Sequence, residues 1–184
     1  LTGCPASDAG PEKTSATTSV KAPSSNSAEA KKEDAAKDAA KDLRIEEREP
    51  ATIGAGEVEV AIEAGGICGS DLHYYNHGGF GAIRLKEPMI LGHEIAGTIS
   101  ALGAGISGFS IGERVAVSPS KPCSMCEYCL RGQQNQCLDM RFYGSAMRFP
   151  HVHGAFREQL LCAASQAVPV AEGVDLAMAA FAEP

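Results

Sequence analysis

Four cysteines crowd into the stretch CSMCEYCLRGQQNQC, at Cys123, Cys126, Cys129 and Cys137. Thiolates two residues apart can converge from a tight turn on one metal ion, and four of them complete a tetrahedral zinc site that has no open position. A disulfide framework is typical of small secreted domains, and a redox pair usually opens a helix beside a strand, whereas this stretch looks loop-like. The spacing therefore predicts a closed, structural zinc site.

A second set of potential metal ligands is spread along the chain. Cys68 lies in GICGSDLHYY, His93 and Glu94 lie in GHE, and Glu183 lies in AEP. Cysteine, histidine and carboxylate are the ligand types of a catalytic zinc that keeps one position for water or substrate. Taken singly, each residue also has a structural explanation, such as a small buried hydrophobe for Cys68 or a solvated turn for Glu183. Spacing alone leaves both interpretations open.

The composition excludes some classes of partner. The 184 residues carry 16 Lys and Arg against 23 Asp and Glu, a net charge of −7. This balance argues against a nucleic-acid partner, because phosphate binding needs a basic face. No apolar run reaches the length of a membrane span. Hydrophobic residues make up 44% of the chain, which is ordinary for a globular protein. Its length of 184 residues is enough for one medium-sized domain and a tail.

The first 42 residues differ in composition from the rest. They are almost entirely Ser, Thr, Ala, Lys, Asp and Pro, which predicts a disordered, low-complexity tail. Within it, AAKDAAKD at 35–42 could form a frayed helix. The opening LTGC resembles the lipobox of bacterial lipoproteins, in which the cysteine, here Cys4, is lipidated. The charged and apolar regions of a signal peptide are absent, so a chance match or a fusion scar stays open beside membrane anchoring.

From Leu43 onward the pattern is that of a β-rich domain. EVEVAIE alternates between apolar and acidic residues, and EIAGTISAL, ERVAVSP and FREQLLC are short apolar runs between glycine-containing turns. Only VDLAMAAFAEP looks helical, with Asp175 as its N-cap. The chain is therefore predicted to be mainly β, as a small barrel or sandwich.

One segment carries a family signature. GHEIAGTISALGAGI matches G-H-E-x2-G-x5-G-x2-[IV], the zinc alcohol dehydrogenase pattern. With GICGSD upstream and the four-cysteine stretch downstream, residues 43–184 resemble the medium-chain zinc-dependent alcohol dehydrogenase family. In finer detail, NQCLDMRFYGSAM, FPHVHGAF and AFAEP look like the branch that includes L-idonate 5-dehydrogenases and sorbitol dehydrogenases. The tail at 1–42 has no counterpart in the family.

The resemblance implies a fold and a site. Residues 43–184 would form an incomplete GroES-like catalytic domain, and the Rossmann domain would be absent from this chain. The catalytic zinc would lie on Cys68, His93, Glu94 and Glu183, directly or through water. Ser70 and His73 would relay the proton, with Ser70 touching the alcohol oxygen, and Tyr74 would line the substrate pocket. Without the resemblance, Ser70 reads as a turn hydroxyl and His73 as a surface imidazole.

The resemblance also implies cofactors and a substrate class. Besides one catalytic and one structural zinc, the full-length protein would use NAD(P) to oxidise a secondary alcohol of a sugar acid or polyol. Arg141 and Arg148 flank FYGSAM and are candidates for binding the carboxylate of a sugar acid, although exposed loop arginines are common. The match GAGISG at 103–108 precedes another strand, so it is not expected to be a dinucleotide fingerprint. No cofactor-binding residue is therefore expected in this chain.

Two alternatives to a dehydrogenase remain. One is a non-catalytic module stapled by zinc and anchored through a lipidated Cys4, and the other is a zinc-ribbon interaction domain. A four-thiolate zinc site favours a reducing cytoplasm, where the family resides. Relatives are commonly dimers or tetramers, so the full-length protein is expected to be a homo-oligomer. The 184-residue chain by itself is expected to lack dehydrogenase activity.

Overall fold

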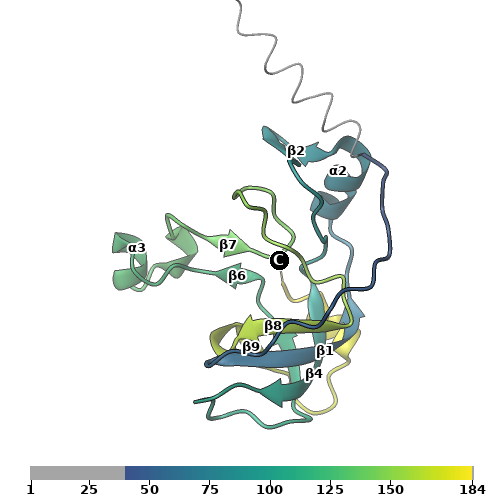
Figure 1. Cartoon of the computed structure of the whole chain (residues 1–184). Coiled ribbons are helices and arrows are strands. Elements are labelled where there is room, and N and C mark those ends of the chain that lie inside the picture. Colours follow the sequence, from purple (N-terminus) through teal and green to yellow (C-terminus); the bar gives the residue numbers. More distant parts are fainter. Residues whose placement is uncertain (1–39, 184) are drawn as a thin grey trace, which may run out of the picture.

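The computed structural model describes residues 40–183, which fold around one antiparallel sheet. Its five strands follow the order β8-β1-β4-β5-β9, and two small hairpins, β2-β3 and β6-β7, stand apart from it (Figure 1). The sheet strands are β1 (Glu57–Gly65), β4 (Ile95–Leu102), β5 (Arg114–Val117), β8 (Gln159–Ala163) and β9 (Ala167–Pro169). The remaining elements are α2 (Gly69–His77), β2 (Gly79–Phe80), β3 (Ile83–Arg84), β6 (Ser120–Lys121), α3 (Glu127–Leu130), η1 (Gln134–Gln136), β7 (Arg141–Phe142), η2 (Ala164–Gln166) and α4 (Leu176–Ala180).

Strand β1 lies between β8 and β4 and shows why the sheet forms. Its residues alternate between the two faces, so the apolar positions share one face. Val58 and Val60 are fully buried in the main core, and Ile62 packs against the same cluster. The alternation predicted a strand here, and the structure confirms it.

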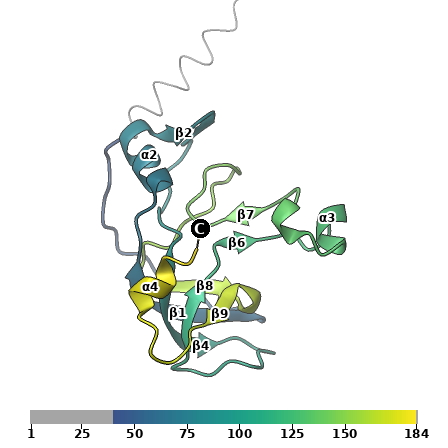
Figure 2. The same ribbon diagram turned by 180° about the vertical axis from the view of Figure 1, so that it is seen from behind.

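The opposite face of the sheet is covered by the short helix α4. Ala96 of β4 is fully buried and packs against Ala179 and Ala180 of α4. Small side chains let the helix approach the strand closely. The carboxylate of Asp175 accepts hydrogen bonds from the backbone N–H groups of Ala177 and Met178, which confirms the predicted N-cap. The chain after α4 then runs to the centre of the molecule (Figure 2).

Two helices were not expected from the sequence. Residues Gly69–His77 form α2, and Glu127–Leu130 form the short helix α3 within the cysteine stretch. The prediction that only the C-terminal segment is helical was therefore wrong. Helix α2 buries Asp71 and Tyr74, three positions apart, and leaves the apolar Leu72 exposed, so its buried face shows no apolar periodicity. Cys126 caps α3, so the description of this stretch as loop-like was too simple.

The elements outside the sheet surround the end of the described chain. Figure 1 shows α2 with β2 on one side, and the β6-β7 hairpin carrying α3 away from the sheet. In both views the chain end lies between these two groups (Figures 1 and 2). This arrangement brings the segments that carry the predicted catalytic ligands to one region.

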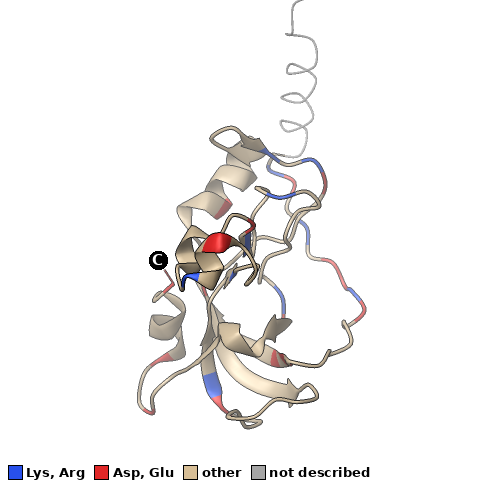
Figure 3. Cartoon of the chain, turned by 90° about the vertical axis from the view of Figure 1, so that its left-hand side faces the viewer, with Lys and Arg blue, Asp and Glu red and all other residues tan. Residues whose placement is uncertain are grey.

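The surface of the described part is mixed in charge. Lys and Arg lie on separate segments interspersed with Asp and Glu (Figure 3), in keeping with the acidic net charge. Among residues 40–183, no helix has both the length and the apolar character needed to cross a bilayer. Cys4 and most of the predicted tail at 1–42 lie outside the described residues.

Replacing Gly97 with Ala should destabilise the sheet. An added Cβ at this position in β4 would overlap the carbonyl oxygen of Ala61 in β1. Overpacking of this kind costs about 1–3 kcal/mol, and we expect urea denaturation of the zinc-saturated chain to show a loss of that size. Gly69→Ala is the matched control, because nothing lies within 4 Å of its added Cβ. Equal losses in the two variants would contradict this account of the sheet.

Candidate metal centres

Three of the predicted catalytic ligands converge at the junction of α2 and β4. Cys68 is the N-cap residue of α2, and His93 and Glu94 immediately precede β4. One potential ligand atom from each of the three lies within 4.8 Å of the others. His93 and Glu94 are buried, at 4% and 5% exposure, and Cys68 is half-buried. A thiol, an imidazole and a carboxylate therefore meet with only limited access to water.

The buried carboxylate of Asp71 holds the two segments together. Its Oδ2 accepts the backbone N–H of Cys68 at 3.0 Å, and its Oδ1 accepts the backbone N–H of Gly92 at 2.9 Å. Asp71 is only 2% exposed, so its buried oxygens need these donors. Its position fixes the backbone beside Cys68 and beside His93. Asp71 was assigned no role from the sequence because no helix was expected at this point, and an acidic residue three positions after an N-cap is a capping signal only once the helix start is known.

The environment of His93 fits a metal-binding imidazole. Its Nδ1 is buried and has no hydrogen-bond partner among residues 40–183, and it lies 3.8 Å from Oδ1 of Asp71. A carboxylate beside the ring orients a ligating histidine. The ring of Phe142 in β7 lies 5.3 Å from the His93 ring, centroid to centroid. The residues present thus suit a zinc ion, which takes sulfur, nitrogen and oxygen ligands.

Glycine is required beside Glu94. A Cβ added to Gly66 would overlap Oε2 of Glu94 and would lie 3.0 Å from the ring of Phe181. The buried Glu94 side chain therefore occupies the space that a larger residue would need. Gly66 also donates its backbone N–H to the carbonyl oxygen of Glu94 at 2.8 Å. Gly66, two positions before Cys68, is thus needed for close packing at the site.

Glu183 lies near this group but does not join its closest contacts. Residues 40–183 contain the close set Cys68, His93 and Glu94, and Glu183 is not within it. Burial raises the pKa of Glu183, the charge of His93 opposes the rise, and the charge of Glu94 adds to it. The chain end that follows α4 therefore brings this carboxyl within electrostatic range of both residues.

Helix α2 carries the three other residues that the resemblance singled out. Ser70 is half-buried, His73 is exposed, and Tyr74 is 4% exposed. The Tyr74 hydroxyl accepts the backbone N–H of Ala146 at 3.1 Å, and the ring packs in a cluster with Leu91. Tyr74 is therefore a packing residue in this structure, whereas Ser70 and His73 keep access to the surface.

The two arginines predicted to bind a carboxylate differ in their surroundings. Arg148 donates to the carbonyl oxygen of Leu138 at 2.6 Å and to that of Met140 at 3.3 Å, and it lies 3.3 Å from Asp139. Its guanidinium thus already has protein partners in the cysteine segment. Arg141 is exposed at the start of β7, next to Phe142.

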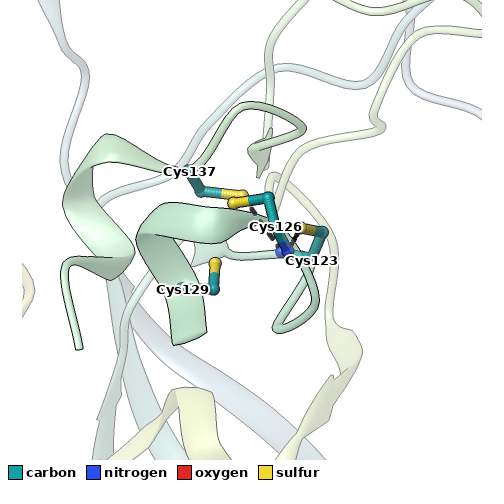
Figure 4. A group of neighbouring side chains, drawn as sticks. All are labelled: Cys123, Cys126, Cys129 and Cys137. Carbon is teal, nitrogen blue, oxygen red and sulfur yellow. Dashed lines mark hydrogen bonds between the residues drawn. The ribbon is translucent and has the colours of Figure 1, made fainter. Parts of the chain in front are cut away.

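The four clustered cysteines also converge. Their sulfur atoms all lie within 4.8 Å of one another, and the side chains point into one common space (Figure 4). Two backbone N–H groups of this stretch donate to sulfur, from Cys123 to Cys137 and from Cys126 to Cys123. All six described cysteines are free, so no disulfide competes for these thiols. Four thiols without another ligand type fit a closed zinc site.

The GAGISG match lies between two antiparallel strands. It follows β4 and leads through turns to β5, which pairs with β4. A dinucleotide fingerprint instead joins a strand to a helix whose N-terminus meets the pyrophosphate. The structure therefore places this match in a different local context, as the sequence analysis expected.

Comparisons with known proteins agree with this geometry. A sequence profile of the alcohol dehydrogenase GroES-like domain matches residues 54–172. The chain belongs to the medium-chain zinc-dependent alcohol dehydrogenase family. The match covers the sheet, the segments of Cys68, His93 and Glu94, and the four-cysteine stretch, which confirms the resemblance and the mainly β fold.

Individual members of the family share up to half of the aligned residues. The chain is 50% identical over 125 residues to an L-idonate 5-dehydrogenase (NAD(P)(+)) of Escherichia coli, an alignment that covers 68% of this chain and 36% of that protein. It is 43% identical over 116 residues to a sorbitol dehydrogenase of Bacillus subtilis, covering 63% and 32%. The crystal structure of an Escherichia coli L-idonate 5-dehydrogenase superimposes with a TM-score of 0.66 at 47% identity, covering 69% of this chain and 36% of that one. The chain thus spans about a third of the length of these relatives.

Asp71→Asn should weaken metal binding at the Cys68 group. An amide cannot accept both backbone N–H groups as a carboxylate does, and its NH2 group would face one of them. Loss of such an orienting partner typically costs 10–100-fold in metal affinity, which chelator competition on the weaker of the two zinc sites would measure. Asp175→Asn is the control, because Asn also caps helices well. Unchanged zinc affinity in Asp71→Asn would contradict the positioning role.

The thiols of the zinc-free chain should differ in reactivity. Hydrogen bonds from the backbone of Cys129 and Leu138 lower the pKa of Cys126 to about 6, whereas burial raises the pKa of Cys129 and of Cys162 to about 12. At pH 7 Cys126 is thus mostly thiolate, the reactive form. We expect iodoacetamide to label Cys126 well before Cys129, with a rate that falls as the pH drops through about 6, as followed by mass spectrometry.

The same shift has a consequence for stability. Because the folded pKa of Cys126 lies below its ordinary value, its contribution to folding is present above that ordinary value and is lost as pH falls through about 6.

Zinc should suppress the iodoacetamide labelling by occupying the thiolates, and Cys162 in the sheet core serves as the internal control. Labelling of Cys129 before Cys126 would contradict this ranking.

Proposed function

We propose that this chain is the zinc-binding catalytic part of an oxidoreductase that oxidises a secondary alcohol of a sugar acid or polyol with NAD(P). The observation that carries the proposal is the convergence of Cys68, His93 and Glu94 at the start of α2. The relatives named for L-idonate and for sorbitol support the substrate class. Ser70 and His73, the candidates for proton transfer, lie on the same helix.

In this proposal Cys68, His93 and Glu94 hold the catalytic zinc, with Glu183 as a further acidic ligand, directly or through water. The four clustered cysteines hold a structural zinc. When bound, the catalytic ion acts as a Lewis acid that makes the substrate hydroxyl more acidic. Asp71 keeps the Cys68 and His93 segments in register through the two backbone hydrogen bonds described above.

Ser70 and His73 would move the proton from the substrate to solvent. They lie three residues apart and therefore share one face of α2. Ser70 is half-buried beside Cys68 and His73 is exposed, so the pair leads from the site to the surface. In this scheme the Ser70 hydroxyl accepts the alcohol proton as its own proton passes to His73. NAD(P), bound by the full-length protein, would accept the hydrogen of the substrate carbon as hydride.

Arg141 is the better candidate for a sugar-acid carboxylate. It is exposed and adjoins Phe142, whose ring contacts His93, whereas the Arg148 guanidinium already binds carbonyl oxygens in the cysteine segment. A guanidinium can bind a carboxylate in a bidentate manner. Tyr74 would support the pocket only indirectly, through its packing. A reducing cytoplasm is the compartment in which four thiolates remain available for zinc.

We infer that the 184-residue chain alone does not turn over a nicotinamide cofactor. It spans about a third of its relatives, and its GxGxxG match lies between antiparallel strands. We also propose that the full-length parent forms a homo-oligomer.

The decisive test combines zinc content with activity. The purified chain should hold two zinc ions by elemental analysis, one lost in Cys126→Ser and the other in Cys68→Ser, while Cys162→Ala, which belongs to neither group, keeps both. The parent protein should reduce NAD(P) with L-idonate or sorbitol and lose this activity in Cys68→Ser. In Arg141→Ala, KM should rise for L-idonate far more than for sorbitol. A parent with both zinc ions and no activity on either substrate would refute the proposed function.

A further inference from the structure

Two exposed histidines lie one turn apart on helix α2. His73 and His77 are four positions apart, and residues at this spacing are neighbours on a helix surface. The centroids of their rings are 5.8 Å apart, with 40° between the ring planes. Both side chains are exposed. The helix thus presents two imidazoles side by side to solvent.

The other three histidines of the chain are engaged elsewhere. His93 is buried in the candidate catalytic group. His151 is buried, and its Nε2 accepts the backbone N–H of Lys86 at 2.9 Å. His153 accepts the backbone N–H of Ile90 through Nδ1. Within residues 40–183, by contrast, no hydrogen bond occupies a ring nitrogen of His73 or His77, so their lone pairs are available.

We propose that His73 and His77 form a surface site for a divalent transition-metal ion, separate from the two centres described above. Imidazole is a good ligand for zinc, nickel and copper, and affinity rises toward copper. Metal–nitrogen bonds are about 2.1 Å long. Two such bonds, together with the distance from each ring nitrogen to its own ring centroid, are long enough to span the 5.8 Å between the two centroids. Water would complete the coordination of the ion.

The neighbouring Phe80 helps to order the pair. Its ring centroid lies 5.2 Å from that of His73, so one side of this imidazole is already packed. A side chain with restricted rotation loses less conformational entropy when it binds. Both histidines belong to one continuous helix, α2. The rigid helix backbone therefore fixes their relative positions before a metal ion binds.

A metal ion bound to His73 and His77 would block the proposed proton relay. This consequence rests on the proposed function. A ring nitrogen that binds a metal has no lone pair left to accept a proton, so His73 could not pass the proton outward. Excess divalent metal would then inhibit the parent enzyme without entering its catalytic centre.

The site can be tested on the chain itself, independently of activity. The untagged, zinc-saturated protein should be retained on Ni2+ immobilised by iminodiacetate and should elute only at raised imidazole concentration. His77→Ala should elute early, whereas His153→Ala, which removes a single exposed histidine, should behave as the wild type. Thermal unfolding should show a Ni2+-dependent rise in Tm for the wild type and for His153→Ala only. Equal retention of His77→Ala and wild type, or equal loss in both variants, would overturn the site.

An activity measurement tests the consequence separately. Ni2+ should inhibit the zinc-loaded parent enzyme, and His77→Ala should be resistant because the chelating pair is broken. If nickel binding depends on His77 but causes no inhibition, the metal site is supported and its effect on the proton relay is refuted. An inactive parent that still binds nickel through His77 would refute the proposed function and leave the site supported.

Discussion

A single buried carboxylate organises the candidate catalytic region. Asp71 accepts hydrogen bonds from the backbone at Cys68 and at Gly92, two segments that are distant in the sequence. Without this acceptor, both N–H groups would be buried and unpaired, which typically costs 1–3 kcal/mol for each group. The same hydrogen bonds fix the backbone where α2 begins and the backbone that leads into β4. The placement of the sulfur of Cys68 and of the His93 ring therefore depends on one side chain that lies outside the close set of candidate ligands.

The sheet supplies the rigid base for this arrangement. His93 and Glu94 immediately precede β4, a central strand that pairs with β1 and β5, so the strand that follows them is held on both sides. Helix α4 packs its alanines on Ala96 of the same strand, and the chain beyond α4 leads to Glu183. Close packing of small residues thus links the far end of the chain to the site.

The two candidate metal centres are connected through the segment around Arg148. Arg148 donates to carbonyl oxygens of Leu138 and Met140, next to the cysteine cluster. Three residues later His151 accepts the backbone N–H of Lys86, and its own N–H is donated to Glu87. Phe142, at the end of the β6-β7 hairpin, contacts the ring of His93. The four-cysteine stretch is therefore tied to the candidate catalytic region.

The sequence by itself determined the features that depend on local spacing and periodicity. The alternation of EVEVAIE predicted β1, Asp175 predicted the cap of α4, the GHE signature identified the family, and four cysteines within one short stretch predicted a converging cluster. Each of these is written in a few adjacent residues, so no knowledge of distant contacts was needed. The same local rules failed for α2, where the apolar periodicity is weak and the helix is held by contacts of Asp71 and Tyr74 with distant segments.

Only the tertiary structure decided how the separate pieces meet. It showed that Asp71 joins two distant backbone segments, that Tyr74 packs inside, and that Arg148 has protein partners, because long-range hydrogen bonds and burial leave no periodic trace in a sequence. It also showed that His73 and His77 face solvent together, which required knowing that their segment is a helix. Residue types and spacing could name the ligands, but the distances that make them a site come from pairing and packing between segments far apart in the chain.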